Sequence, residues 1–169
     1  YGDPDHVPSE ECDPVRPLCP YGVTKAAVEM YLHYYSQVHG LAYTTLRYPN
    51  IYGPRQDPQG EAGVIAIFAR KMLRAEPISI FGSGEQERDY LYVGDVARAN
   101  LLALKAGDGQ AYNLGWGRGV SVTEVFQRLK ALTRYPLDPT FQPARKGEVS
   151  KNYLSAAKIQ RELGWQPRV

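Results

Sequence analysis

Residues 19–26, CPYGVTKA, place a tyrosine and a lysine four positions apart where a helix is expected to begin. A helix turns once in about 3.6 residues, so Tyr21 and Lys25 would project from one face and could share a ligand. Pro20 suits the first helical turn, where its missing N–H leaves no hydrogen bond unmade. A phenol is a poor base near neutral pH unless a nearby cation stabilises its phenolate, and Lys25 would supply that cation. The pair is a candidate acid–base site, although an isolated Y-x-x-x-K is equally typical of an exposed helix surface.

The elements that must position this pair alternate between helices and short strands. Residues 1–19, which contain four prolines, predict an ordered loop. Strands are expected over 41–48, 78–81, 89–93 and 111–115, with a loop over 49–61. Helices are expected over 20–39, ended by Gly40, and over 63–75, and a third is expected from a cap at Asp95 to 106, with Gly107 as its stop. This alternation is typical of an α/β protein.

Two further helices are expected in the second half of the chain. Ser121 and Glu124 have the spacing of a capping box, and the helix after them would be buried through Val125, Phe126, Leu129 and Leu132. Ser155 would cap a short last helix that stops at Gly164. The helix over 20–39 carries two apolar stripes, which predicts that it is sandwiched between a sheet and a partner subunit.

Composition excludes several classes of protein. The chain has 20 basic and 18 acidic residues, and this balance predicts no general attraction to nucleic acid or to a membrane surface. No apolar stretch is long enough to span a bilayer. Cys12 and Cys19 have no histidine cluster nearby, so we expect reduced thiols in a cytoplasmic protein and no metal site.

Three further segments add polar side chains that could bind a phosphorylated ligand. The segment 46–60, LRYPNIYGPRQDPQG, places Asn50 just past the carboxyl end of a strand, where α/β proteins bind ligands. Arg88 follows a glycine-containing loop, and Arg145 precedes Glu148 by three residues. Two arginines from distant segments suit a diphosphate, because a planar guanidinium binds phosphate oxygens in a fork.

Together these segments resemble the extended short-chain dehydrogenase/reductase family, the NAD-dependent sugar-nucleotide epimerases and dehydratases. The segments RYPNIYGPRQDP and RDYLYVGDVARA look most like those of the UDP-glucose 4-epimerases and their N-acetylated-sugar relatives. The resemblance runs through essentially the whole chain. It implies NAD as the cofactor, a UDP-sugar as the substrate, and epimerisation of a UDP-hexose at C4 through a transient 4-keto sugar.

The resemblance also implies a role for individual residues. Tyr21 would be the base that takes the proton from the sugar 4-hydroxyl, and Lys25 would stabilise its phenolate and hold the nicotinamide ribose. Tyr48 and Pro49 would lie against the nicotinamide. The substrate would be bound by Asn50 at its phosphates, by Ser79 and Phe81 around the uracil with the main chain near Val64, by Arg88 and Arg145 at the diphosphate, and by Glu148 at the uridine ribose.

The resemblance further implies how the chain is organised. Residues 1–60 would end the NAD-binding Rossmann domain, and residues 61–169 would mainly form the smaller substrate-binding domain, with some segments returning to the Rossmann sheet. The sequence has no G-x-x-G-x-x-G or G-x-G-x-x-G run, so we expect the glycine-rich half of the dinucleotide-binding domain to lie upstream, in a longer enzyme. The chain alone would then be inactive. The helix over 20–39 would join a homodimer interface.

Alternatives stay open on the sequence alone. Asn152, seven residues after Arg145, stands where many glucose-specific members resemble one another in having a tyrosine, so UDP-N-acetylglucosamine is an alternative substrate, unless the alignment slips by one residue. A sugar-nucleotide 4,6-dehydratase or a UDP-glucuronate decarboxylase would share the same fold. A non-catalytic nucleotide-sugar binding protein is the alternative of a different class, and the intact pair of Tyr21 and Lys25 argues against it.

Overall fold

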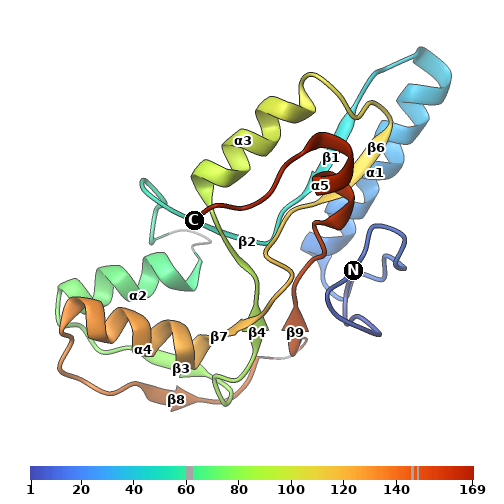
Figure 1. Ribbon diagram of the computed structural model, residues 1–169. Coiled ribbons are helices and arrows are strands. Elements are labelled where there is room, and N and C mark those ends of the chain that lie inside the picture. Colours follow the sequence, from blue (N-terminus) through green and yellow to red (C-terminus); the bar gives the residue numbers. More distant parts are fainter. Residues whose placement is uncertain (60–62, 146, 148) are drawn as a thin grey trace.

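The computed structural model describes residues 1–59, 63–145, 147 and 149–169, and Figure 1 shows its arrangement. The helices are α1 (Pro20–His39), α2 (Val64–Leu73), α3 (Val93–Ala103), α4 (Val122–Thr133) and α5 (Ala157–Leu163). The strands are β1 (Thr44–Arg47), β2 (Asn50–Tyr52), β3 (Ser79–Phe81), β4 (Glu87–Arg88), β5 (Tyr90–Tyr92), β6 (Gln110–Asn113), β7 (Val120–Ser121), β8 (Thr140–Gln142) and β9 (Lys151–Asn152). None of the helices over these residues is long and apolar enough to cross a membrane. The predicted α/β class is confirmed.

Most of the strand pairs are parallel and join distant parts of the chain. Strand β1 pairs with β6, β2 with β5, and β3 with β8, all in parallel. Strand β4 pairs in parallel with β9 and antiparallel with β7. Parallel partners require crossover connections, and the helices supply them. The carboxyl ends of β1 and β2 therefore face loops that can carry a site.

Two apolar cores hold these elements together. One core lies between α2 and α4 over β3, around Phe68, Ile80 and Phe126, at the lower left of Figure 1. The other lies among α3, α5, β5 and β6, around Leu91, Ile159 and Trp165. Phe126 and Trp165 are both fully buried, so each core is fixed by an aromatic side chain.

Helix α1 has the predicted bounds but not the predicted burial. Pro20 occupies its first turn, and Gly40 ends it in the left-handed conformation with φ of 68°. No residue of α1 is buried, and Met30 and Tyr34 on one predicted apolar stripe are 72% and 50% exposed. The expectation that α1 is sandwiched between a sheet and a partner subunit is thus not met by this chain at Met30 and Tyr34, and coverage by a partner subunit stays a prediction.

Two predicted features of α3 are wrong. Its N-cap is Tyr92, and Asp95 lies inside the first turn with its carboxylate buried. That carboxylate accepts hydrogen bonds from the main-chain N–H groups of Arg168 and Val169, so it holds the C-terminal segment and does not cap the helix. The helix ends at Ala103, and Gly107 turns the chain into β6 with φ of 94°.

The ends of α4 and α5 confirm part of the capping prediction. Ser121 Oγ accepts from the Glu124 N–H at 3.1 Å, as expected of a capping residue. Leu132 is 81% exposed and not buried, because it lies on the solvent side of α4. The N-cap of α5 is Ala156, and the adjacent Ser155 accepts from the Ala157 N–H. Gly164 ends α5 in the left-handed conformation, as predicted.

The strands differ from prediction mainly in short segments. Residues 50–52, expected in a loop, form β2 because their main chain pairs with that of β5. Strand β1 is shorter than the expected 41–48, and the expected strand 89–93 is β5 alone. Strands β7, β8 and β9 were not predicted, because two or three residues carry too little periodicity to be recognised.

Candidate active site

Tyr21 and Lys25 lie together on the first turns of α1. The Lys25 Nζ atom is 5.2 Å from the centre of the Tyr21 ring. Both side chains are exposed, Tyr21 to 65%, so the phenol is open to a ligand. The Thr24 hydroxyl donates to the Tyr21 carbonyl at 2.7 Å and reinforces this turn. The pair therefore lies together on one face of the helix, as the sequence predicted, with the Lys25 ammonium over the Tyr21 ring.

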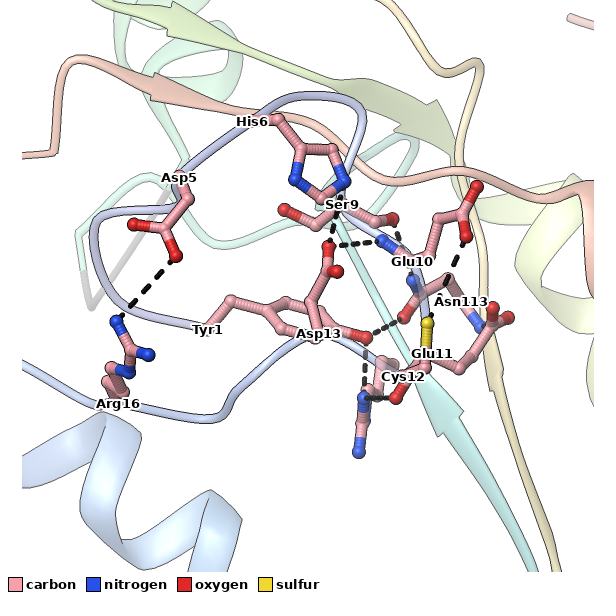
Figure 2. Close-up of polar contacts among 11 residues, drawn as sticks. Tyr1, Asp5, His6, Ser9, Glu10, Glu11, Cys12, Asp13, Arg16 and Asn113 are labelled. Carbon is pink, nitrogen blue, oxygen red and sulfur yellow. Dashed lines mark hydrogen bonds and ion pairs between the residues drawn. The ribbon is translucent and has the colours of Figure 1, made fainter.

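Helix α1 is attached to the sheet through a polar network that the sequence analysis missed. Arg47 on β1 donates to both carboxylate oxygens of Glu29 on α1, at 2.8 and 2.6 Å. Its guanidinium also donates to the Tyr1 hydroxyl, which in turn donates to Asn113 Oδ1 at 2.7 Å. Figure 2 shows the Tyr1 side chain reaching from the N-terminal loop to Asn113 on β6. The loop, α1, β1 and β6 thus share one set of hydrogen bonds.

Two members of this network have shifted pKa values, with different causes. Burial raises the pKa of the Tyr1 phenol, so its hydroxyl stays a neutral donor to Asn113. The hydrogen bonds to Glu29 raise the pKa of Arg47 above its ordinary value. Asn113 is fully buried, and its own N–H donates to Glu11 Oε1 at 2.7 Å. A charged residue inside the strand pattern 44–47 was the available signal for this network.

The residues predicted to lie near the cofactor follow directly after β1. The Tyr48 hydroxyl donates to Asn100 Oδ1 at 3.0 Å, which anchors its ring to α3, and the side chain stays 44% exposed. Pro49 follows between β1 and β2 and is half-buried. The Asn50 N–H donates to the Asp89 carbonyl at 2.9 Å, while the Asn50 residue is exposed. Its side-chain amide is therefore presented at the edge of β2.

Phe81 and Arg145, predicted to bind the substrate, contact each other. The Arg145 guanidinium lies 4.1 Å from the centre of the Phe81 ring, at the end of β3. Ser79 on the same strand shares a 3.0 Å hydrogen bond with Thr140 on β8. Val64 begins α2 and packs partly against the core there. A flat aromatic ring beside a guanidinium suits a base next to a phosphate.

Arg88 and Asn152 form a second predicted group. They are register partners on the parallel strands β4 and β9. The Arg88 guanidinium donates to the Glu87 carbonyl at 2.8 Å, and Asn152 is exposed beside it. The neighbouring Tyr153 is half-buried against Gly119, so of these two residues Asn152 is the one that is exposed next to Arg88. Glu148, predicted to reach the uridine ribose, lies outside the described residues.

The predicted residues therefore lie on several separate elements of the fold. Helix α1 with Tyr21 and Lys25 lies at the end of the molecule opposite β3 and β8, as Figure 1 shows. Arg88 and Asn152 lie on β4 and β9, between that helix and the strands β3 and β8.

Asp89 joins several of these segments, and the sequence analysis missed it as well. Its carbonyl accepts from Asn50, and its N–H donates to the Asn152 carbonyl at 3.2 Å. Its fully buried carboxylate accepts from the N–H groups of Trp116 and Gly117, at 2.9 and 3.1 Å. Burial nevertheless raises the pKa of the Asp89 carboxyl to about 6. The signal was again a charge inside a strand pattern, RDYLYV.

A cavity of about 310 Å³ lies beside this carboxylate and is separate from the predicted site. Tyr90, Arg118 and Arg128 contribute to its wall, and none of the predicted site residues lines it. Among the residues that the structure describes, no group of three or more His, Cys, Asp or Glu side chains has the arrangement of a metal site.

Comparison with known proteins gives a consistent result. Residues 1–115 match the model of the NAD dependent epimerase/dehydratase family. A putative UDP-glucose 4-epimerase of Methanocaldococcus jannaschii is 44% identical over 169 residues, which cover all of this chain and 55% of that protein. The chain thus spans about half the length of the curated relatives that it matches.

Solved structures agree with this match. The UDP-glucose 4-epimerase of Thermotoga maritima with UDP-glucose is 51% identical, with a TM-score of 0.95 over 97% of this chain and 53% of that one. The UDP-glucose 4-epimerase of Thermus thermophilus in complex with NAD is 42% identical, with a TM-score of 0.91 over all of this chain and 56% of that one. The similarity covers every element that carries the predicted site.

Proposed function

Because the chain belongs to the NAD dependent epimerase/dehydratase family, we propose that it carries the catalytic base and most of the nucleotide-sugar contacts of a UDP-hexose 4-epimerase. The observation that carries this proposal is the exposed Tyr21 phenol with the Lys25 ammonium beside it. The reaction would interconvert UDP-glucose and UDP-galactose through a 4-keto sugar.

Tyr21 would hold the proton that moves in each half of the reaction. Its phenolate, stabilised by Lys25, would take the proton from the sugar 4-hydroxyl. It would return this proton to the 4-keto oxygen after the sugar has rotated to present its other face. The chemistry that NAD supplies when bound is reversible acceptance of the hydrogen on the sugar 4-carbon, so no second substrate is consumed. Lys25 is exposed and within reach of a ribose, which fits this cofactor.

The diphosphate would be held at a distance from the phenol. Arg88 and Arg145 would bind its oxygens, Asn50 would donate to the same phosphates, and Phe81 with Ser79 would frame the uracil. The contact between Arg145 and Phe81 supports this order of groups. Holding the nucleotide while leaving the sugar free is what allows the 4-keto sugar to present either face.

We also propose that two parts of the chain bind different ligands. Residues 1–60 would complete the NAD-binding domain and residues 61–169 would mainly bind the nucleotide sugar. The core between α2 and α4 supports a separate substrate unit, and the pairing of β1 with β6 supports the return of later segments to the first unit. Turnover would need the glycine-rich strand–turn–helix that this sequence lacks, so we expect activity from the full-length protein and not from residues 1–169 alone.

Replacing Tyr21 by phenylalanine tests the catalytic role. In the full-length protein we expect Tyr21→Phe to abolish turnover and to leave the affinity for UDP-glucose nearly unchanged. Tyr31→Phe is the matched control, because Tyr31 lies on the same helix and is also 65% exposed. Comparable activity in the two variants would remove Tyr21 from the mechanism.

A second substrate is favoured by one observation. Asn152, exposed beside Arg88, would leave more room near the sugar than a tyrosine, so UDP-N-acetylglucosamine is the alternative substrate. We expect Asn152→Tyr to lower kcat/KM for UDP-N-acetylglucosamine more than for UDP-glucose. An equal effect on both substrates would place Asn152 away from the sugar. A 4,6-dehydratase, a decarboxylase and a silent binding protein are distinguished by the product formed.

Helix α1 would mediate homodimerisation. Its exposed apolar side chains include Met30 and Val38, at 72% and 58% exposure, and a paired helix would cover them. Sedimentation velocity of the full-length protein is expected to give a dimer, and Met30→Glu is expected to weaken it. A monomer at micromolar concentration would contradict this interface.

A cytoplasmic location is the last part of the proposal. Cys12 and Cys19 are both free and exposed, as expected for thiols in a reducing compartment. Alkylation of both thiols in freshly isolated protein would support this location, and a disulfide-linked form would argue against it.

A further inference from the structure

Helix α1 carries three side chains in one row, each one turn from the next. Tyr21, Lys25 and Glu29 are spaced by four residues, so Lys25 can turn either to the phenol before it or to the carboxylate after it. In the structure its Nζ atom lies 5.2 Å from the centre of the Tyr21 ring. The Glu29 carboxylate is instead paired with Arg47. Whether Glu29 pairs with Arg47 or with Lys25 therefore decides whether Lys25 remains beside Tyr21.

Arg47 holds Glu29 in a geometry that only an arginine can provide. Both oxygens of the carboxylate accept from the guanidinium, and the two side chains are only 17% and 29% exposed. The guanidinium also lies 5.0 Å from the centre of the Tyr1 ring. A bidentate pair of this kind fixes both partners in orientation, whereas a lysine would offer one point charge. Both carboxylate oxygens of Glu29 are thus engaged by Arg47.

We propose that Arg47 is a positioning residue for catalysis, because its pairing with Glu29 withdraws a competing carboxylate from Lys25 and so leaves the ammonium to the Tyr21 phenolate. The inference rests on the proposed function of Tyr21. Arg47 would then influence catalysis although it would touch neither substrate nor cofactor.

The consequence of losing Arg47 follows from its burial. Glu29 would become a partly buried carboxylate without its partner, which is costly, and the ammonium one turn back on its own helix is the nearest replacement. Lys25 would turn toward Glu29, and the phenolate would lose the neighbouring charge that favours it.

Three variants of the full-length protein test this inference. We expect Arg47→Gln to lower kcat by about tenfold or more, since an opposite charge nearby shifts a proton affinity by about one to three pK units. KM for the UDP-sugar should stay within about twofold, because a tenfold change in affinity requires about 1.4 kcal/mol and the diphosphate contacts are untouched. Glu29→Gln should retain most of kcat. The double variant Arg47→Gln/Glu29→Gln should recover most of the loss, because no carboxylate then competes for Lys25.

A purely structural role of the Arg47–Glu29 pair predicts a different pattern of activities among the three variants. If Arg47 and Glu29 only attach α1 to β1, removing either should be equally harmful, and the double variant should be no more active than Arg47→Gln. That result would overturn the inference. A matched loss of kcat and rise of KM in Arg47→Gln would overturn it too.

Nuclear magnetic resonance on residues 1–169 separates this inference from the proposed function. The nuclear Overhauser effect between the Lys25 ε-protons and the Tyr21 ring should be present in the wild type, lost in Arg47→Gln and restored in the double variant. Lys158, whose Nζ lies 4.9 Å from the centre of the Tyr112 ring, is the internal control and should keep its contact throughout. An unchanged Lys25 contact in Arg47→Gln overturns the inference whatever the activity. Absence of turnover in the wild-type enzyme overturns the proposed function alone.

Discussion

Replacing Asp89 by asparagine is expected to remove a pH dependence of stability that this buried carboxylate gives the chain. The carboxylate is fully buried and accepts from the N–H groups of Trp116 and Gly117. Those hydrogen bonds favour the charged form, while loss of water favours the neutral form. Burial dominates, because the pKa of Asp89 is raised from 3.8 to about 6.

The magnitude follows from the difference between the folded and unfolded pKa. The folded chain keeps a proton between pH 4 and pH 6 that the unfolded chain has released. The free energy of unfolding contributed by Asp89 is therefore fully present below pH 4 and falls as the pH rises through 6. At about 1.4 kcal/mol per pKa unit, the loss is about 3 kcal/mol.

Denaturant unfolding at a series of pH values from 4 to 7 measures this contribution. From pH 4 to 7, the free energy of unfolding of the wild type should fall by about 3 kcal/mol relative to that of Asp89→Asn. The variant should therefore gain in relative stability as the pH rises. Asp108→Asn, at an exposed turn, controls for the loss of one carboxylate. A difference that grows with pH would show that the N–H groups outweigh burial, and would refute the reasoning.

Four further substitutions test the fold and the site. Ser121→Ala should lower the free energy of unfolding by about 1 kcal/mol, because it removes the hydrogen bond to the Glu124 N–H at the start of α4. Phe126→Ala should cost about 3–5 kcal/mol in urea unfolding, because the ring is fully buried, whereas Leu132→Ala on the exposed side of the same helix should cost no more than about 0.5 kcal/mol. Arg145→Ala should raise KM for UDP-glucose about tenfold in steady-state kinetics with a smaller effect on kcat, since a hydrogen bond to a charged group contributes about 1.5–3 kcal/mol, and an unchanged KM would place Arg145 off the diphosphate.

The longer elements could be predicted because their signals are local. Pro20 and Gly40 mark both ends of α1, and Gly164 marks the end of α5. A proline fixes its own φ near a helical value, and a glycine adopts the left-handed conformation that ends a helix without steric cost, so such positions can be recognised without knowledge of the fold. The short strands β7 and β9 were missed because only their pairing with β4 makes them strands.

The site could be predicted in part for the same reason. Tyr21 and Lys25 are neighbours through helical spacing alone, and the structure brings them together as expected. Arg47 and Asp89 act through partners distant in the chain, so their roles depend on tertiary contacts that a single sequence does not display. Asp95 was misread as a cap because aspartate is common there, yet its carboxylate binds the C-terminal segment.

The central claim is that Tyr21, with Lys25 beside it, serves a sugar-nucleotide 4-epimerase. Incubating the full-length protein with UDP-glucose and, separately, with UDP-N-acetylglucosamine, and resolving the products by chromatography, tests it most directly. We predict that at least one of the two is converted to its 4-epimer without added NADH. A 4-keto-6-deoxy sugar nucleotide, or no product from either substrate, would contradict the account.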